Sequence, residues 1–402
     1  MGDVYKHSYL NIAAASAKND EEGCFFLRDM VAGLAPCKVD INSELHYPPL
    51  GDDPGFFFSL KKPFWISQPD AWSHYVENAR IQERGWVFQE CLLAPRTVYF
   101  SYTHVAWECR ASTLHDLDPF VVETPPKFHN ARVSFVDLFE NDHSLIGDES
   151  NIRIWCNIVR DYSKTYFTFK SDELIALSGR TKEAQRIFRD NCIAGMWRRG
   201  LALQLFWEVM SLPGGTRVRR PRSGYCAPSW SWASAVAPVD FPIMNGTPTM
   251  TIMEVYITRG DEGEMGPVTT GHLIAEARVP QAKILWPDFG ETLVERYDCV
   301  NILYDIPPRQ DGTNTKPVSA FFVFDYPTIP SEFDIILVET YQTPKRFEGL
   351  ILHRVPEHHT FKRLGTWLIW NESVMEALGS QEKHFLDDMR KLTATRQVVK
   401  VI

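Results

Sequence analysis

The stretch Arg84–Cys109, RGWVFQECLLAPRTVYFSYTHVAWEC, carries the signals for one helix followed by two strands. Four residues spaced i, i+3, i+4 and i+7 predict a continuous helical stripe: Trp86, Gln89, Glu90 and Leu93. Pro95 ends this helix, because proline lacks the N–H and restricts the residue before it. The β-branched and aromatic runs 97–100 and 105–109 flank a short polar turn, which predicts a hairpin. This part of the chain is therefore expected to mix α and β structure.

A carboxylate lies on the predicted helical stripe. Because an ionised carboxylate on a partly buried face is costly unless it is paired, we predict that Glu90 lies within hydrogen-bonding distance of Arg84 or Arg96. Two roles for Glu90 stay open. Either the pair ties the helix end to the hairpin, which is the commoner use of such pairs, or Glu90 is a general acid or base in a cleft.

In the second case the candidate site has two sets of residues. The catalytic set is Glu90, Glu108 and Arg96, which would supply acid–base chemistry and charge stabilisation. The ligand-binding set consists of polar and aromatic side chains that could line a cleft: Arg84, Trp86, Gln89, Trp107, Trp230 and Trp232. Aromatic rings are also common core residues, so the same set is compatible with a purely structural role.

The composition excludes several classes of protein. The chain has 402 residues, 44% hydrophobic and 23% charged, which is typical of globular proteins of more than one domain. A net charge of −9 argues against nucleic-acid binding, which needs a basic face. No long apolar run predicts a membrane span, and no signal peptide opens the chain, so we expect a cytoplasmic protein.

No motif in the sequence predicts a cofactor or a metal. Walker, dinucleotide-binding, nucleophile-elbow and H-E-x-x-H patterns do not occur. The eight cysteines are scattered without a C-x-x-C pair, which favours reduced thiols over a zinc site or a disulfide framework. We therefore expect no cofactor and no bound metal.

The character of the sequence changes after residue 222. Ser229–Ser234, SWSWAS, alternates with period 2 and predicts a half-buried strand, and similar short runs separated by turn residues recur to about residue 370. The predicted fold class is α+β, with a mixed α/β domain at 1–222 and a β-rich domain at 223–402. The β-rich domain is expected to be an antiparallel sandwich or an open barrel, with Trp230 and Trp232 near the domain boundary.

The run RGWVFQECLLAPRTVYF followed by WEC resembles the signature of the fungal heterokaryon incompatibility (HET) domain family. The opening MGDVYKHSYLNIAAASAKNDEEGCFFLRD and the later blocks SDELIALSG, AGMWRRGLALQLFW and APSWSWAS are similar to further family blocks, so that the resemblance spans about residues 1–235. The family's opening blocks, one containing a Tyr-Cys-Trp-Gly-like sequence and one Trp-Ile-Asp, are not found in this sequence. Any activity that those blocks carry is expected not to be inherited.

The resemblance implies a signalling or interaction protein of the kind used in fungal non-self recognition and programmed cell death, with a TIR-like fold suggested for some members. A protein or a small-molecule ligand would be its partner, without nucleic acid or membrane, and enzymatic activity is not the leading expectation. The alternative is an enzyme with an aromatic cleft near Trp86 and Glu90. Its reaction would be a secondary-metabolite cyclisation or lyase step, or hydrolysis of a nucleotide cofactor.

Overall fold

The computed structural model of the chain describes the following residues: 2–19, 21–27, 37–40, 43–47, 56–60, 63–66, 72, 76, 79–102, 104–109, 112–116, 148–210, 225–235, 237–242, 247–260, 267–280, 282–286, 294–304, 318–328, 334–342, 346–356, 359–370 and 396–402. The chain divides into two compact units, Met1–Val133 and Ser134–Ile402. The boundary predicted at 222/223 thus falls inside the second unit. The predicted α+β class with a β-rich C-terminal part is confirmed.

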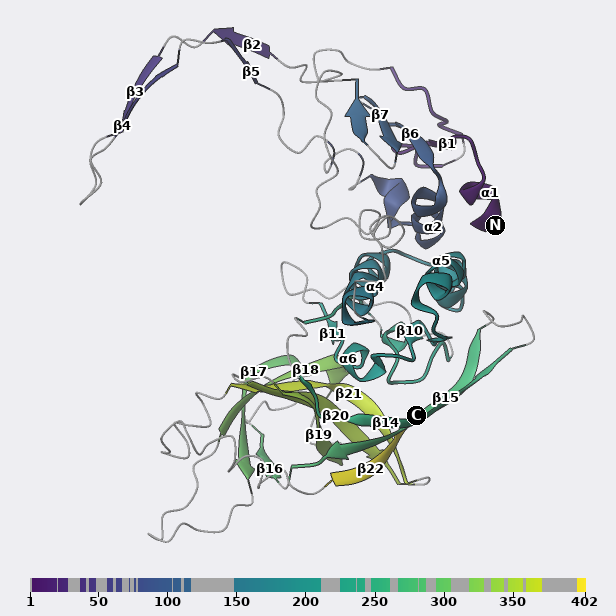
Figure 1. The fold of residues 1–402 in the computed structure, drawn as a ribbon, viewed down its shortest axis with the longest axis vertical. Coiled ribbons are helices and arrows are strands. Elements are labelled where there is room, and N and C mark those ends of the chain that lie inside the picture. The colour runs from purple at the N-terminus through teal and green to yellow at the C-terminus, as the bar shows by residue number, and fades with distance from the viewer. Residues whose placement is uncertain are drawn as a thin grey trace. The chain divides into compact units, whose positions relative to one another are not determined.

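The first unit contains a four-stranded sheet in the order β1-β6-β7-β8 (Figure 1). Its strands are β1 (Asn11–Ala13), β6 (Arg96–Phe100), β7 (Val105–Cys109) and β8 (Thr113–His115). β1 runs parallel to β6, whereas the other two pairings are antiparallel. The predicted hairpin is confirmed, because Arg96 pairs with Cys109 and Phe100 with Val105.

The helices that the structure describes in the first unit are short: α1 (Gly2–Lys6), the 3-10 turn η2 (Arg80–Glu83) and α2 (Gly85–Leu93). The predicted end of α2 is confirmed, since Ala94 already has an extended backbone before Pro95. The predicted stripe is only partly buried. Gln89 and Leu93 are buried, but Trp86 and Glu90 are half-buried. Two further hairpins pair β2 (Cys37–Asp40) with β5 (Pro63–Ile66) and β3 (Ser43–Tyr47) with β4 (Phe56–Leu60).

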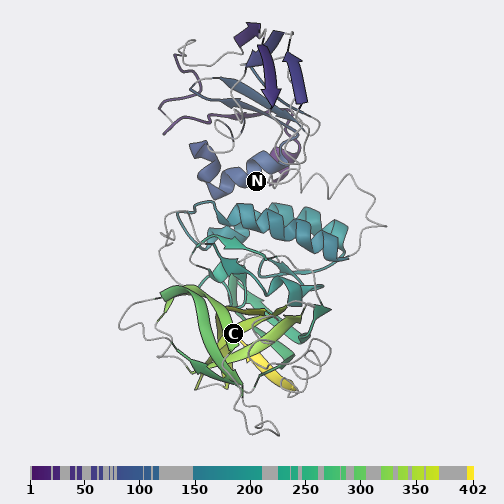
Figure 2. The ribbon, with the colours of Figure 1, turned by 90° about the vertical axis from the view of Figure 1, so that its left-hand side faces the viewer.

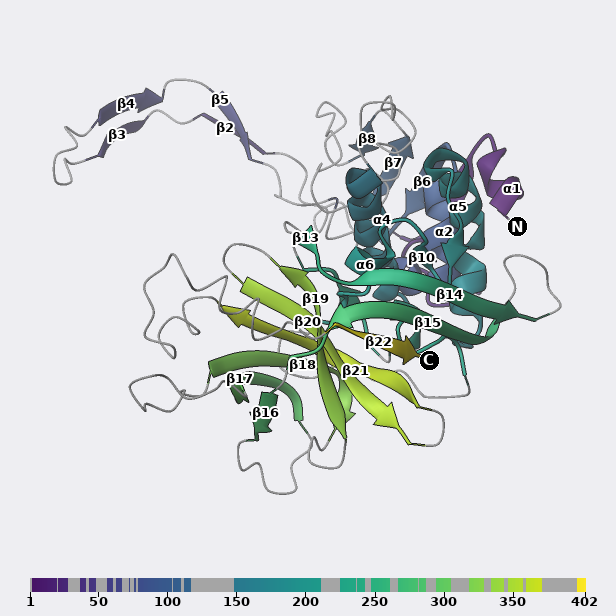
Figure 3. The same ribbon diagram turned by 60° about the horizontal axis from the view of Figure 1, so that its bottom comes forward.

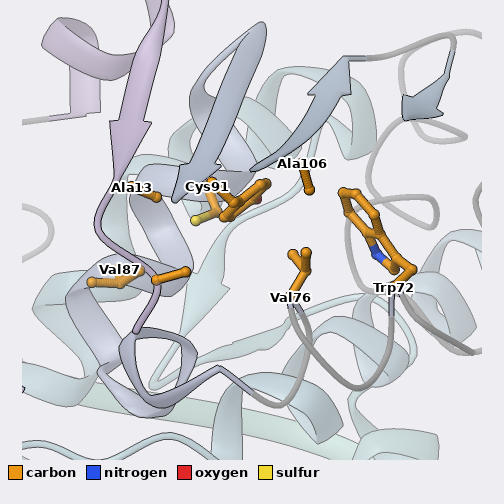
Figure 4. Packing of buried hydrophobic residues seen from close by; sticks show 8 residues of the cluster. Ala13, Trp72, Val76, Val87, Cys91 and Ala106 are labelled. Atoms are coloured by element: carbon orange, nitrogen blue, oxygen red, sulfur yellow. The ribbon is translucent and has the colours of Figure 1, made fainter. Parts of the chain in front are cut away.

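A compact cluster of apolar side chains fills the space between α2 and the sheet. Val87 and Cys91, one helical turn apart, contribute from α2. The other members are Ala13, Ala15, Trp72, Val76, Tyr99 and Ala106. Figure 4 shows that the cluster's side chains from α2 and from the strands point toward the same space as those of Val76 and Trp72. The contact face of α2 is therefore the Val87–Cys91 edge, one position away from the predicted stripe.

The helical part of the second unit precedes its sheet. Two long helices, α4 (Asp148–Ser163) and α5 (Asp172–Phe188), are followed by the short α6 (Leu201–Gln204), and the two long helices lie on one side of this unit's strands (Figure 2). Two small pairs of strands accompany them: β9 (Cys192–Ile193) pairs with β10 (Met196–Trp197) between α5 and α6, and β11 (Glu208–Val209) pairs with β12 (Val239–Asp240) after α6. Among the described helices, none is both long and apolar enough to cross a bilayer.

A ten-stranded sheet makes up the rest of the second unit (Figure 3). Its strands are β13 (Thr247–Pro248), β14 (Thr251–Arg259), β15 (Val268–Arg278), β16 (Ala282–Leu285), β17 (Val294–Tyr304), β18 (Val318–Thr328), β19 (Ile335–Gln342), β20 (Arg346–Val355), β21 (Thr360–Trp370) and β22 (Arg396–Val401). Successive pairings β15-β19-β20-β21-β22-β15 form a closed ring. The contact between β21 and β22 is parallel, whereas the other pairings of the ring are antiparallel.

Arg363 links the helical part of this unit to its sheet. It is buried on β21 with Asp325 of β18, its Nε 2.8 Å from Oδ2 and its Nη2 3.1 Å from Oδ1. The guanidinium also donates to the carbonyl groups of Leu205 and Trp207 and lies 3.5 Å from the centre of the Trp207 ring. Since Leu205 and Trp207 follow α6, one side chain holds three segments together.

The strand predicted at Ser229–Ser234 is wrong. The segment forms a turn and the 3-10 helix η3 (Trp232–Ser234), because the Ser231 hydroxyl accepts the N–H of Ala233 and caps the turn. Trp230 and Trp232 are both fully buried in the core of the second unit. The alternation of polar and aromatic residues arises from a capped turn and not from the two faces of a strand.

Candidate functional site

The central feature of the first unit is a buried tyrosine–carboxylate pair. Tyr99 of β6 donates its hydroxyl to Glu108 Oε2 of β7 at 2.7 Å, and the two side chains are 1% and 4% exposed. Thr97 is the residue directly opposite Glu108, so Tyr99 reaches it diagonally across the hairpin. The Trp72 ring packs edge-on against Tyr99 at 5.9 Å. A hydrogen bond between two buried side chains on neighbouring strands holds the strands in register.

Further polar side chains share the buried face with this pair. Ser101, His104 and His115 are buried, together with Thr97 and Thr113. Ser101 Oγ lies 3.0 Å from His104 Nδ1 and accepts the His104 N–H at 3.1 Å. The His104 and His115 rings meet edge to face at 6.0 Å. The serine and histidine are therefore tied into their own turn, an arrangement that stabilises hairpins.

The sequence prediction missed Tyr99, Ser101, His104 and His115. The signal that could have found them is the period-2 alternation of the hairpin. Polar residues recur at every second position of β6 and again on β7 and β8, so the buried face of this sheet is partly polar.

Glu90 has a tyrosine partner in place of the predicted arginine. Its half-buried carboxylate accepts a hydrogen bond from the Tyr5 hydroxyl of α1. Burial raises the pKa of Glu90, while the Tyr5 hydrogen bond and the nearby charge of Arg84 lower it. Burial, together with the adjacent Glu90 carboxylate, also raises the pKa of Tyr5 to about 12. Glu90 thus joins α1 to α2.

The two arginines that were predicted to pair with Glu90 have other surroundings. Arg84 is exposed at the N-cap of α2 and acts on Glu90 only through its charge. Arg96 is exposed at the start of β6, with its guanidinium 5.1 Å from the centre of the Tyr9 ring and Nη1 3.5 Å from the Tyr9 carbonyl oxygen. The prediction of a Glu90–arginine hydrogen bond is therefore corrected.

The predicted ligand-binding aromatics do not lie on one surface. Trp86 is half-buried and Gln89 buried on α2. Trp107 is half-buried on β7 and points to the face opposite its neighbour Glu108, as alternation along a strand requires. Trp230 and Trp232 belong to the core of the other unit. Within the described residues of the first unit, Glu108 forms a hydrogen bond with Tyr99 of the apolar cluster, whereas Glu90 precedes Cys91, another member, on α2.

Within the described part of the chain, no three histidine, cysteine, aspartate or glutamate side chains gather in a group that could hold a metal ion. Tyrosine and carboxylate side chains form the site, with histidines beside them. Hydroxyl, carboxyl and imidazole groups of this kind can donate and accept protons.

Residues 1–90 match the family model described as Heterokaryon incompatibility protein (HET). The resemblance is thereby confirmed for α1, β1 and most of α2, whereas the hairpin β6–β7 lies beyond the matched residues. Searches of curated proteins and of solved structures gave no match. The N-terminal part of the chain is thus similar to heterokaryon incompatibility proteins over these 90 residues.

Proposed function

We propose that this chain is a signalling or interaction protein of the heterokaryon incompatibility type, which acts in the cytoplasm of a fungal cell. On this proposal it takes part in non-self recognition and the cell death that follows, by binding a protein partner. The match of residues 1–90 supports the family part of the proposal. On this proposal the chain itself catalyses no reaction.

The Tyr99–Glu108 hydrogen bond is the observation that carries this proposal. A carboxylate that serves as general acid or base must reach a substrate proton. Glu108 is 4% exposed and holds a tyrosine inside the sheet, which favours a structural role. Glu90 is likewise engaged by Tyr5.

Exposed apolar side chains on α1 and β1 support a protein partner. Val4 is 70% exposed and Ile12 is 61% exposed. In the order of its sheet, β1 comes first and is followed by its neighbour β6. Large apolar side chains and a strand at a sheet edge are features that other chains bind.

The test is expression of the full chain in a filamentous fungus, with hyphal viability measured by dye exclusion. We expect cell death with the native chain and its loss in the double variant Val4→Ser/Ile12→Ser. Met253→Ser, which changes an exposed apolar residue of the other unit, is the matched control and should behave as the native chain does. Death that survives the double variant but is abolished by Glu90→Gln would contradict an interaction role.

An enzyme is the second candidate, and Glu90 is the observation that favours it. A half-buried carboxyl with a raised pKa beside a tyrosine hydroxyl is a known form of general acid. Incubation of pure protein with NAD, followed by chromatography for nicotinamide, tests the hydrolase version. We expect no release of nicotinamide above background. Turnover that is abolished by Glu90→Gln would instead favour the enzyme over the interaction protein.

A further inference from the structure

The sheet of the first unit has an open edge at β1. Among the described strands, β1 pairs with β6 alone (Figure 1). Beyond the paired residues, the Ala15 N–H still donates to the Phe100 carbonyl at 2.9 Å. Backbone groups alternate in direction along a strand, so Asn11 and Ala13 direct theirs toward β6, whereas the N–H and C=O of Ile12 point away from it. An edge of this kind can accept a further strand.

A row of apolar side chains crosses the outer face of this sheet and ends at the open edge. The register places Ile12 beside Val98, Val98 beside Trp107, and Trp107 beside Leu114. Val98, Trp107 and Leu114 are half-buried, whereas Ile12 is 61% exposed. Side chains that lie next to each other on neighbouring strands shield one another from water. Ile12 has such a neighbour on β6, but none of the described strands supplies one on its other side.

Arg96 brings a positive charge to the same edge. It is exposed on the outer face of β6, two positions before Val98. Its guanidinium lies 5.1 Å from the centre of the Tyr9 ring, and its Nη1 donates to the Tyr9 carbonyl at 3.5 Å. Tyr9 shortly precedes β1, so the arginine side chain reaches from β6 to the start of β1. In the described part of the chain, Arg96 forms no ion pair.

The charge of Arg96 and the apolar side chain of Ile12 lie two positions apart along β1. Arg96 comes one position before Thr97, the partner of Asn11, and is therefore level with Leu10. A guanidinium has five N–H donors, so donors remain beside the one that the Tyr9 carbonyl accepts. A carboxylate can accept two of them in parallel. Since alternate residues of a strand share a face, one added strand can serve both positions.

We propose that the protein partner adds an extended segment as an antiparallel strand beside β1, and that an apolar residue of this segment is followed two positions later by Asp or Glu. The inference rests on the proposed function, which supplies the protein partner. The apolar side chain packs beside Ile12 and continues its row, while the carboxylate binds Arg96. An antiparallel strand gives Ile12 a directly opposed residue that exchanges two hydrogen bonds with it.

Fluorescence anisotropy on the full chain with labelled heptapeptides tests the proposal. The probe is Thr-Thr-Ile-Thr-Glu-Thr-Thr, and the matched peptide, Thr-Thr-Ile-Glu-Thr-Thr-Thr, has the same composition with the carboxylate on the opposite face. We expect saturable binding of the probe and affinity at least about threefold weaker for the matched peptide. Methylation of the isoleucine nitrogen of the probe should weaken binding as well, because it removes a donor to the Ile12 carbonyl. Equal affinity of the three peptides, or no saturable binding of the probe, would overturn the proposal. Tighter binding of the reversed order, Thr-Thr-Glu-Thr-Ile-Thr-Thr, would contradict an antiparallel strand.

Two variants locate the binding. Arg96→Gln is expected to weaken binding of the probe at least about threefold. Arg80→Gln removes the same charge from an exposed arginine of η2, and this variant should bind as the native chain does. Native affinity in a folded Arg96→Gln variant would show that the carboxylate binds elsewhere. Should that variant not fold, the peptides compared on the native chain still decide the outcome.

The peptide assay is separate from the test of the proposed function. If the native chain kills hyphae but does not bind the probe, the strand addition is refuted and the proposed function stands. If the chain binds the probe with the expected spacing but kills no hyphae, the proposed function is refuted and the open edge of β1 is still a strand-binding site.

Discussion

The Tyr99 hydroxyl donates to Glu108 Oε2 at 2.7 Å across two neighbouring strands, with both side chains buried. The pair lies beside the apolar cluster that α2 and the sheet share, since Tyr99 is itself a member of that cluster. One residue thus contributes to the core through its ring and to the polar face through its hydroxyl.

Replacing Tyr99 by Phe should lower the free energy of unfolding by about 1–3 kcal/mol, because the buried Glu108 carboxyl loses a hydrogen-bond donor. Chemical denaturation followed by fluorescence measures this change. Tyr102→Phe is the matched control, since Tyr102 is exposed and its hydroxyl lies 3.3 Å from Glu22 Oε2. The control should cost less than about 1 kcal/mol. Equal effects of the two substitutions would contradict a special role for Tyr99.

Arg363→Ala should destabilise the second unit by about 3–5 kcal/mol, because it leaves the buried Asp325 carboxylate without its cation. Arg354→Ala removes an arginine from the exposed pair with Asp334, in which the side chains are 50% and 69% exposed. That control should cost no more than about 1 kcal/mol. Thermal unfolding of the two variants side by side distinguishes the buried pair from the exposed one.

Glu348 should make stability depend on pH. Its pKa is raised from 4.5 to about 7, because the effect of burial outweighs the lowering by the charge of Arg346, and nearby Glu208 adds a smaller raising effect. A carboxyl with a raised folded-state pKa binds its proton more tightly in the folded chain, so its stabilising contribution is complete below pH 4.5. This contribution is lost as the pH rises through about 7. The loss is on the order of 3 kcal/mol.

The measurement is urea unfolding at several pH values for the native chain and for Glu348→Gln. Other buried carboxyls, such as Glu339, also have a raised pKa, so only the difference between the two proteins isolates Glu348. The variant should gain stability relative to the native chain as the pH increases. Glu254→Gln, at an exposed position of β14, should show no such trend. A flat difference for Glu348→Gln would refute the assignment.

Gly349 should not tolerate a methyl group. A Cβ at this position would overlap the Val338 carbonyl oxygen and the Trp367 indole, both part of the sheet. Gly349→Ala should therefore cost at least about 1–3 kcal/mol. Gly260→Ala is the control, because its nearest neighbour would be Pro267 at 3.5 Å, an ordinary contact. A difference below about 0.5 kcal/mol between the two variants would show that the strands shift at little cost.

Local signals in the sequence predicted the helix–hairpin segment well. Pro95 and the β-branched run after it fix where α2 ends and β6 begins, and both depend on near neighbours alone. The partner of Glu90 could not be predicted in this way. Tyr5 lies far from Glu90 in the sequence, and only the packing of α1 brings it to α2.

The segment at Trp230 and Trp232 shows a second limit of sequence patterns. Alternation of polar and aromatic residues predicts a strand, but Ser231 binds the backbone two residues ahead and Trp232 donates to Gly195. Serine competes with regular structure through such local hydrogen bonds. The burial of the polar face around Glu108 could not be predicted either, because burial depends on which side of the hairpin α2 covers.

The closed ring of strands has a consequence for how the second unit acquires its structure. β22 provides the final side of the ring, and its Val401 pairs with Leu273 of β15. Contacts between residues so distant in sequence slow folding, because a long loop must close before they form. During synthesis the ring cannot close until residues 396–401 have left the ribosome. Until then β15 and β21 present open edges that chaperones or other nascent chains can bind.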